Sequence, residues 1–212
     1  MRYKAVLFDL DGTILDTISE LAITMNEVRR SAGLEPQPVE AVRAMVGNGI
    51  RNLIKRSTAG EDVDQEQLHT LFMNYYNVHC CENTYPYPGV FELLLRLKME
   101  GCKLAVVSNK ADGPSNILVE NFFPGVFDCV RGHREDTPLK PNREVIDSVL
   151  GELGVDASDA VYVGDSEVDI QTAANSGMPC ISVDWGFKSH EFLVDHKASC
   201  IVSDMIELAG EL

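Results

Sequence analysis

Basic residues are scarce in this sequence. Its 212 residues include 33 Asp and Glu but only 18 Lys and Arg, which gives a formal net charge of −15 at pH 7. Proteins that bind nucleic acids or anionic membrane surfaces need clustered Lys and Arg to neutralise the phosphates. The composition therefore argues against nucleic acid and membrane partners.

Long hydrophobic runs and paired cysteine motifs are also lacking. No segment approaches the roughly 18 uninterrupted apolar residues of a membrane-spanning helix. The apolar N-terminal stretch is interrupted at Asp9, too early for a signal peptide, so we expect a cytoplasmic protein. None of the six cysteines stands in a CxxC pair, and a chain of this length does not depend on disulfides, so we expect reduced, structural thiols.

Short apolar runs that lead into polar residues indicate a buried parallel sheet. These runs are AVLFD ending at Asp9, LAVVSN at Ser108, AVYVGD ending at Asp165 and CISVD ending at Asp184. Continuous runs rich in Val and Leu are typical of strands buried on both faces. Helical patterns lie between them: residues 90–100, a helix with Asp112 as N-cap, a helix from Pro141 to Gly151 or Gly154, and a helix ending at Gly177. The alternation predicts an α/β fold, a Rossmann-like parallel sheet flanked by helices.

The segment from Ile18 to Cys80 shows helical periodicity alone, in pieces separated by glycines and prolines. We interpret it as an all-helical cap inserted after the first strand, with Thr84 to Gly89 as the return linker. The predicted division is an α/β core of residues 1–16 and 85–212 and a cap of residues 17–84. The alternative is a few extra helices packed on the sheet.

One part of the predicted cap is basic. The segment from Arg43 to Arg56 contains no acid, and its basic residues are Arg43, Arg51, Lys55 and Arg56. Such a run is either a solvated helix face or a rim that faces an anion. On the second interpretation, the neighbouring glycine loop and the basic helix supply candidate substrate contacts at Asn48, Gly49 and Arg51.

Two carboxylates follow the first strand, in the sequence Asp9-Leu10-Asp11-Gly12-Thr13. In an extended chain alternate side chains share a face about 6.6 Å apart, so both carboxylates can flank one small electrophile. One can act as nucleophile or metal ligand while the other exchanges protons. A simple acidic turn is the alternative. A calcium-binding EF-hand loop does not fit, because Ile14 stands where that loop needs Gly.

Further polar residues stand at or after the other predicted strands. These are Ser108, Asn109, Lys140 before Pro141, Asp165 and Asp169. In open α/β sheets ligands bind outside the carboxyl ends of the strands, so these side chains are expected to converge on one crevice. Taken singly, each has an ordinary explanation as a turn former, surface charge or helix cap. Together, in this order, they favour one active site.

Together these residues resemble the conserved motifs of the haloacid dehalogenase superfamily. The four motifs are DLDGT at Asp9 to Thr13, VVSN ending at Ser108 and Asn109, Lys140-Pro141, and GDSEVD at Gly164 to Asp169. Within the superfamily the chain most resembles the phosphoglycolate phosphatase group, through MVGNGI, YPYPGV, VSNK and DWG. Ser108 stands where that group commonly has Thr, and it keeps the hydroxyl.

The resemblance implies a mechanism and a cofactor. Asp9 would attack a phosphate monoester and form an aspartyl phosphate, and Asp11 would act as general acid and then general base. Mg²⁺ would be held by Asp9, Asp165 and the backbone carbonyl of Asp11, with Asp169 orienting these groups. The phosphoryl oxygens would be held by Ser108, Lys140 and amides around Gly12 and Asn109. The implied substrate is a small phosphorylated metabolite, phosphoglycolate or a similar compound.

Other activities remain open. Dehalogenases of the superfamily lack the second aspartate, so Asp11 argues against carbon–halogen cleavage. Phosphonate hydrolases need a cap lysine, for which Lys55 is the candidate, and a phosphosugar mutase resembling β-phosphoglucomutase would bind a second phosphate in the cap. A pyrophosphatase on the same scaffold and, from a different class, a phospho-acceptor signalling domain are further alternatives. The sequence does not distinguish a monomer from a homodimer.

Overall fold

Six strands form one parallel sheet in the computed structural model, which describes residues 2–212. The strands are β1 (Ala5–Phe8), β4 (Lys103–Ala111), β5 (Cys129–His133), β6 (Ala160–Gly164), β7 (Cys180–Val183) and β8 (Ile201–Val202). Their order is β5-β4-β1-β6-β7-β8, and every neighbouring pair is parallel. Every residue of the central strand β1 is buried, as its continuous apolar run predicts.

Successive residues of the central strand pack on opposite faces of the sheet. Val6 and Phe8 belong to one apolar core, and Ala5 and Leu7 belong to the other, because side chains alternate along a strand. The first face is covered by α5 (Val90–Met99), α6 (Asp112–Phe122) and α10 (Met205–Glu211), and the second by α7 (Glu144–Leu153) and α8 (Glu167–Ser176). A short helix, α9 (His190–Asp195), lies between β7 and β8 in the chain. The predicted α/β fold with a helix-flanked parallel sheet is confirmed.

Glycines end the helices where the sequence predicts, but two predicted helix starts are wrong. Gly154 and Gly177, both at positive φ, follow α7 and α8. Helix α7 begins at Glu144 instead of Pro141. Its first turn is closed by the side chain of Asn142, whose Oδ1 accepts the Glu144 N–H at 2.9 Å. Likewise Asp112 is the first residue of α6 and not its N-cap, because its carboxylate accepts the N–H of Gly132 instead.

The apolar runs do not predict the two edge strands. β5 contains Arg131, Gly132 and His133, and only part of it is buried, while β8 has two residues. β4 also continues beyond Ser108 to Ala111, so Ser108 and Asn109 lie within the strand. Edge strands need less apolar sequence than central strands, because one of their sides has no neighbouring strand.

The topology places a crevice at the carboxyl end of β1. From β1 the chain builds β4 and β5 on one side, and it later builds β6, β7 and β8 on the other. The order of the strands therefore reverses around β1, and such a switch point opens a crevice outside the carboxyl ends. Asp9 directly follows β1, and Asp165 directly follows β6.

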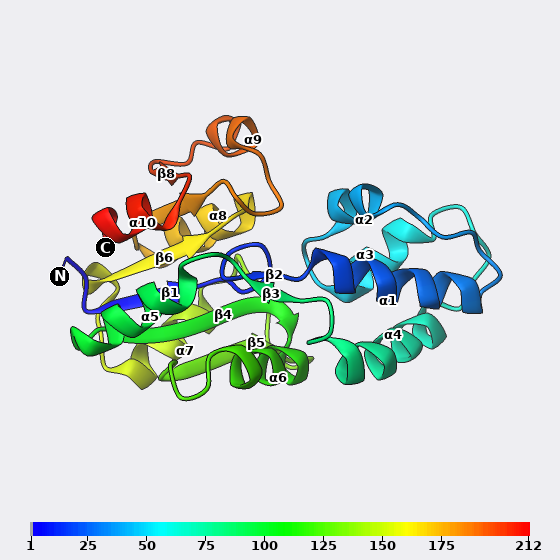
Figure 1. Ribbon diagram of the computed structural model, residues 1–212, viewed down its shortest axis with the longest axis horizontal. Helices are drawn as coiled ribbons and strands as arrows, with labels where there is room; N and C mark the ends of the chain where they lie inside the picture. Colours follow the sequence, from blue (N-terminus) through cyan, green and yellow to red (C-terminus); the bar gives the residue numbers. More distant parts are fainter. Residues whose placement is uncertain (1) are drawn as a thin grey trace.

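Four helices lie between two short antiparallel strands, β2 (Leu15–Asp16) and β3 (Tyr85–Pro86). The helices are α1 (Ile18–Ser31), α2 (Val39–Met45), α3 (Ile50–Ser57) and α4 (Gln65–His79). Figure 1 shows them as a group beside the sheet, coloured blue to green-cyan, rather than stacked on one of its faces. The segment is all-helical, as its periodicity predicts. Because β2 pairs with β3, the two chain segments that connect the helices to the sheet run side by side.

A buried carboxylate ties the first of these helices to the return connection. Glu20 in α1 is 1% exposed. Its Oε2 accepts the backbone N–H of Asn83 at 3.2 Å and the Asn83 Nδ2 group at 2.8 Å. Thr24 donates to the other oxygen at 3.4 Å. A buried carboxylate is stable only when its oxygens are satisfied in this way.

Among residues 2–212, no helix combines the length and the hydropathy that a membrane crossing needs. The six cysteines of the chain are free, and Cys80, Cys102, Cys129 and Cys180 are buried. Burial raises the pKa of the Cys102 thiol to about 11, which keeps it in its unreactive form. These thiols have the structural role that the sequence predicts.

Glu20→Ala should lower the free energy of unfolding by about 1–3 kcal/mol, because it leaves the partly buried Asn83 donors without their acceptor. Urea unfolding followed by circular dichroism measures the change. Glu27→Ala is the matched control on the same helix, since the Glu27 side chain is 43% exposed and pairs with Arg30, and it should change stability by less than about 0.5 kcal/mol. Equal effects of the two substitutions would contradict the role assigned to Glu20.

Candidate active site

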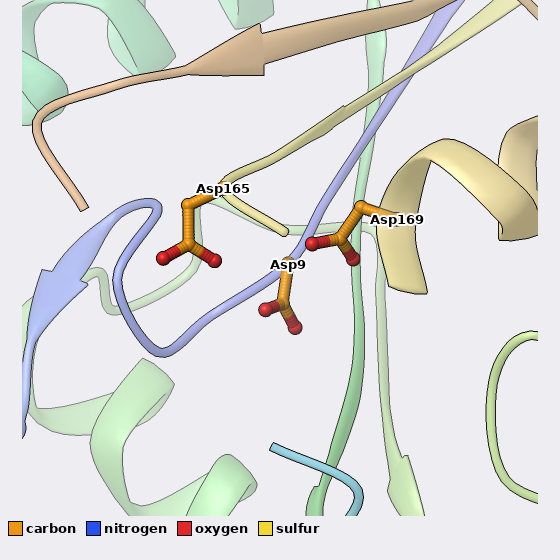
Figure 2. Close-up of side chains that lie close together, drawn as sticks. All are labelled: Asp9, Asp165 and Asp169. Carbon is orange, nitrogen blue, oxygen red and sulfur yellow. The ribbon is translucent and has the colours of Figure 1, made fainter. Parts of the chain in front are cut away.

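Three carboxylates meet at the carboxyl end of the sheet. Asp9 follows β1, Asp165 follows β6, and Asp169 lies in the first turn of α8. Figure 2 shows the three side chains directed toward a common space, and a carboxylate oxygen of each lies within 4.8 Å of the others. The structure thus brings together three of the residues that the sequence singles out. We call them the acid cluster.

The ammonium group of Lys140 lies between two members of the acid cluster. Its Nζ is 2.9 Å from Asp9 Oδ1 and 2.8 Å from Asp169 Oδ1, and it donates a third hydrogen bond to Tyr162 Oη at 2.7 Å. The Tyr162 hydroxyl in turn donates to the carbonyl oxygen of Val107 in β4. All three ammonium protons therefore have acceptors, as a buried lysine requires.

Burial dominates the electrostatics of the acid cluster. It raises the pKa of Asp9 to about 6, because the loss of solvation together with Asp169 and Asp11 outweighs the opposing effect of Lys140. Burial, and after it Asp169 and Asp9, also hold the pKa of Asp165 well above its usual value. Burial alone would lower the pKa of Lys140, but Asp169 and Asp9 outweigh it and raise this pKa. One ammonium against three carboxylates leaves the site short of positive charge.

The remaining carboxylate oxygens fit a divalent cation. Both oxygens of Asp169 are engaged, because its Oδ2 also accepts the N–H and the hydroxyl of Ser166, at 3.1 and 2.7 Å, in a capping box. Within residues 2–212, no hydrogen-bond donor contacts Oδ2 of Asp9 or Oδ1 of Asp165. Hard divalent cations prefer carboxylate oxygens of this kind. The geometry therefore suits Asp9 and Asp165 as ligands, and it suits Asp169 as the residue that orients Lys140.

Asp11 stands apart from the acid cluster. Its Oδ1 and Oδ2 lie 3.0 and 3.2 Å from Lys110 Nζ, and Oδ1 also accepts the hydroxyl of Thr17 at 2.7 Å. Asp11 lines the same cavity as Asp9. Its side chain is thus separate from the group that could hold a metal, and only its backbone carbonyl stays a candidate ligand.

Ser108 is free to donate into the site, whereas the Asn109 side chain and the Gly12 N–H make other hydrogen bonds, although Asn109 lines the cavity. Ser108 Oγ accepts the N–H of Lys110 at 3.3 Å, and its own proton has no acceptor among the described residues. The Asn109 side chain makes two hydrogen bonds with the backbone of Lys140, at 2.7 and 3.1 Å. The Gly12 N–H donates to Leu15 O at 2.9 Å. Because that bond closes the turn after Asp11, the structure does not bring the Gly12 amide to the cavity as a phosphate ligand.

Two glycines let the backbone approach Asp165 closely. Gly12 has a φ of +81°, and a Cβ on it would overlap Asp165 Oδ2. A Cβ on Gly186 would overlap the Gly12 carbonyl oxygen and lie 2.5 Å from Asp165 Oδ2. The next residue, Phe187, donates its N–H to the same carboxylate oxygen at 2.6 Å. The contribution of Gly12 is therefore space for Asp165.

A cavity of about 80 Å³ lies over these groups. Its wall on the sheet side includes Asp9, Asp11, Ser108, Lys140 and Asp165. The opposite wall comes from the helical insert: Leu21, Val46, Gly47, Asn48, Gly49, Ile50 and Leu53. The predicted contacts Asn48 and Gly49 therefore face the acid cluster.

Residues 6–183 match the sequence model of the haloacid dehalogenase-like hydrolases. The chain belongs to this family. The phosphoglycolate phosphatase of Caulobacter vibrioides is 35% identical over 188 residues, which cover 86% of this chain and 79% of that protein. The phosphoglycolate phosphatase of Mesorhizobium japonicum is 30% identical and matches 100% of this chain and 96% of that protein.

A solved structure agrees with this assignment. A crystal structure from Lactobacillus delbrueckii subsp. bulgaricus is 36% identical, has a TM-score of 0.90, and is matched over 100% of this chain and 98% of that one. The resemblance that the four motifs indicate is confirmed. The chain is an enzyme, a phosphatase of the haloacid dehalogenase-like family.

The basic residues of the insert do not line the cavity of this phosphatase. Arg51 is half-exposed and pairs with Glu66 and, at 3.8 Å, with Glu135, so the structure does not bring it to the site with Asn48 and Gly49. Arg43 pairs with Glu40 at 3.3 Å, and Lys55 is exposed. Arg51 and Lys55 thus belong to a solvated helix face, the first of the two interpretations, whereas Arg43 lies over the ring of Phe187 at 5.7 Å.

Several residues of the site carry no role in the sequence-based prediction. Lys110 and Tyr162 are buried against Asp11 and Lys140, and Gly186 and Phe187 support Asp165. The sequence does carry a signal for Lys110, which lies near the end of an apolar strand. A lysine buried there needs a partner for its charge. Phe187 has no such signal, because its backbone N–H makes the contact.

Cation binding should weaken as the pH falls through about 6. The Asp9 carboxyl binds a proton more tightly when folded, with its pKa raised to about 6 from 3.8, so protons compete with the metal below that pH. In metal-free protein, ionisation of Asp9 lowers the free energy of unfolding above about pH 6. The free energy of unfolding rises again as the pH falls from about 6 to 4 and Asp9 is protonated. Calorimetric titration with Mg²⁺ should show an affinity at least about tenfold lower at pH 5 than at pH 7.5. An unchanged affinity would show that Asp9 is not a ligand.

Gly186→Ala should lower Mg²⁺ affinity at least about tenfold, because the added Cβ displaces Asp165. The matched control is Gly151→Ala in α7, where no atom lies within 4 Å of the new Cβ, and the affinity should stay unchanged. Calorimetric titration of both variants at neutral pH gives the comparison. Equal Mg²⁺ affinities in the two variants would contradict the role of Gly186 in leaving space for Asp165.

Proposed function

We propose that this phosphatase hydrolyses a small phosphate monoester, phosphoglycolate or a close analogue, with Mg²⁺ as cofactor and through an aspartyl phosphate on Asp9. The observation that carries the proposal is the small cavity with Asp9, Asp11 and Lys140 on one wall. Its relatives from Caulobacter vibrioides and Mesorhizobium japonicum are phosphoglycolate phosphatases, which supports the choice of substrate.

In the first step a carboxylate oxygen of Asp9 attacks the phosphorus atom, and the bond between phosphorus and the leaving oxygen breaks. Asp11 gives a proton to that oxygen as the alcohol departs. Lys140 lies 2.9 Å from Asp9 and places its positive charge beside the phosphoryl oxygens, where negative charge sits in the transition state, while the Ser108 hydroxyl donates to one of them. Asp169 keeps Lys140 in place.

In the second step a water molecule attacks the phosphorus of the aspartyl phosphate. Asp11, now a carboxylate, takes a proton from this water, and inorganic phosphate leaves while Asp9 is regenerated. Mg²⁺ held by Asp9, Asp165 and the Asp11 backbone carbonyl would offset the charge of the phosphoryl group. One carboxyl group thus serves both steps, and the enzyme returns to its starting protonation state.

On this proposal, the helical insert determines which leaving group the site accepts. We assign residues 17–84 to a cap that covers the site and excludes water, and residues 1–16 and 85–212 to the core. The cap side of the cavity carries apolar side chains and the glycine loop from Gly47 to Gly49, with no basic side chain. A second phosphate would find no cation there, so the mutase alternative is not favoured. Lys55 is exposed, and an imine-forming phosphonate hydrolase is not favoured either.

Asp9→Asn should abolish Mg²⁺-dependent phosphate release, with kcat lowered at least about 1,000-fold, because the amide cannot form the acyl phosphate. Phosphate release from phosphoglycolate, sugar phosphates, nucleotides and pyrophosphate measures activity and substrate choice together. Asp159→Asn, at an exposed ion pair with Lys4, is the control and should keep full activity.

Two results would contradict the proposal. A folded Asp9→Asn protein that still turns over would exclude Asp9 as nucleophile. A wild-type enzyme that prefers pyrophosphate, or that yields a sugar phosphate isomer faster than free phosphate, would replace the proposed substrate by one of the alternatives.

A further inference from the structure

Lys110 is a buried cation that the four motifs leave without a role. It lies in β4, two residues after Ser108, and only 1% of its side chain is exposed. A lysine is rarely buried this deeply unless its charge is matched. Its Nζ lies 3.0 and 3.2 Å from the two oxygens of Asp11. Lys110 also lines the cavity over the acid cluster.

The helical insert completes the surroundings of this ammonium group. Tyr76 of α4 is 1% exposed and accepts a hydrogen bond from Lys110 Nζ at 2.7 Å. The same nitrogen lies 4.4 Å from the centre of the Tyr76 ring, close enough for a cation–π interaction. Tyr76 itself stacks on Phe72 at 5.4 Å. Helix α4 thus supplies both a polar and an aromatic partner to a lysine of the sheet.

A third contact joins the same carboxylate to the start of the insert. Thr17, buried immediately before α1, donates its hydroxyl to Asp11 Oδ1 at 2.7 Å. The Asp11 side chain is therefore held by Lys110 from the sheet and by Thr17 from the entry to the insert. Tyr76 holds Lys110 from the opposite end of the insert. Of these contacts, only that of Tyr76 with Lys110 requires α4 to lie against the sheet.

We infer that Lys110 and Tyr76 are positioning residues that couple the placement of the helical insert to the orientation of Asp11. With α4 in place, Tyr76 fixes the Lys110 ammonium, and the ammonium fixes the carboxyl group that exchanges protons with the leaving oxygen. With α4 displaced, Lys110 loses the hydroxyl and the ring face together. The proton donor is then aligned only when the site is covered. This inference rests on the proposed function of Asp11.

The leaving group of the substrate tests the inference. Departure of an alcohol from phosphoglycolate needs a proton, whereas 2,4-dinitrophenolate leaves 2,4-dinitrophenyl phosphate as a stable anion. Misplacing a proton donor therefore slows the first substrate selectively, and kcat/KM reports this step because it covers the reaction up to formation of the aspartyl phosphate. General acid catalysis contributes about 100-fold or more. A purely structural defect would slow both substrates alike.

Lys110→Met should lower kcat/KM for phosphoglycolate at least about 50-fold and for 2,4-dinitrophenyl phosphate less than about threefold. Tyr76→Phe, which keeps the ring and removes the hydroxyl, should give the same selective loss at about fivefold. The double variant should be no slower than Lys110→Met alone, since Tyr76 acts through Lys110. The control is Lys103→Met in the same strand, an exposed lysine 3.4 Å from Asp128, and it should leave both substrates unaffected.

Equal losses on the two substrates, no loss on either, or additive effects in the double variant would each overturn the inference while leaving the proposed function intact. If Lys110→Met does not fold, the ratio of the two substrates in Tyr76→Phe decides alone, and an unchanged ratio overturns the inference. A wild-type enzyme that hydrolyses neither substrate would instead contradict the proposed function, so the two failures are distinguishable.

Discussion

The Lys140 ammonium between Asp9 and Asp169 is the interaction on which the rest of the site depends. The parallel sheet delivers carboxylates from the ends of β1 and β6 and the start of α8 to one buried point. Buried like charges repel, and each loses its solvation. Lys140 offsets part of this cost through hydrogen bonds of 2.9 and 2.8 Å. Asn109 holds Lys140 at its backbone, and Tyr162 holds it at its ammonium group.

The same charge arrangement explains why a strongly acidic protein can act on a phosphate ester. Three carboxylates with a single ammonium leave two oxygens without a donor, one on Asp9 and one on Asp165. A divalent cation at those oxygens would reverse the local sign of charge. The formal net charge sums over the whole chain and does not describe the charge balance at any one place. A buried site of about 80 Å³ follows its own charge balance.

Much of the core and the site could be predicted from particular residues. Apolar runs fix β1, β4, β6 and β7, and polar residues at or near their ends fix Asp9, Ser108 and Asp165, because parallel strands end at one edge. The partners of these groups could not be predicted in this way. Tyr76 reaches Lys110 across 34 residues of sequence, and that contact depends on how the insert packs. The Gly12 N–H donates to a carbonyl oxygen in a local turn, and Arg51 pairs with two glutamates. Neither the motif nor the charge pattern reveals that these groups bind other partners instead of the substrate.

The central claim is that Asp9 is the nucleophile in a site whose charges are held by Lys140. Rapid acid quenching of the enzyme during turnover of phosphoglycolate with a radiolabelled phosphate group, followed by peptide mapping, tests it most directly. The account predicts label on the peptide that contains Asp9, and loss of that label when the quench is followed by hydroxylamine. An enzyme that turns over without any labelled peptide, or with the label on Ser108, would contradict it.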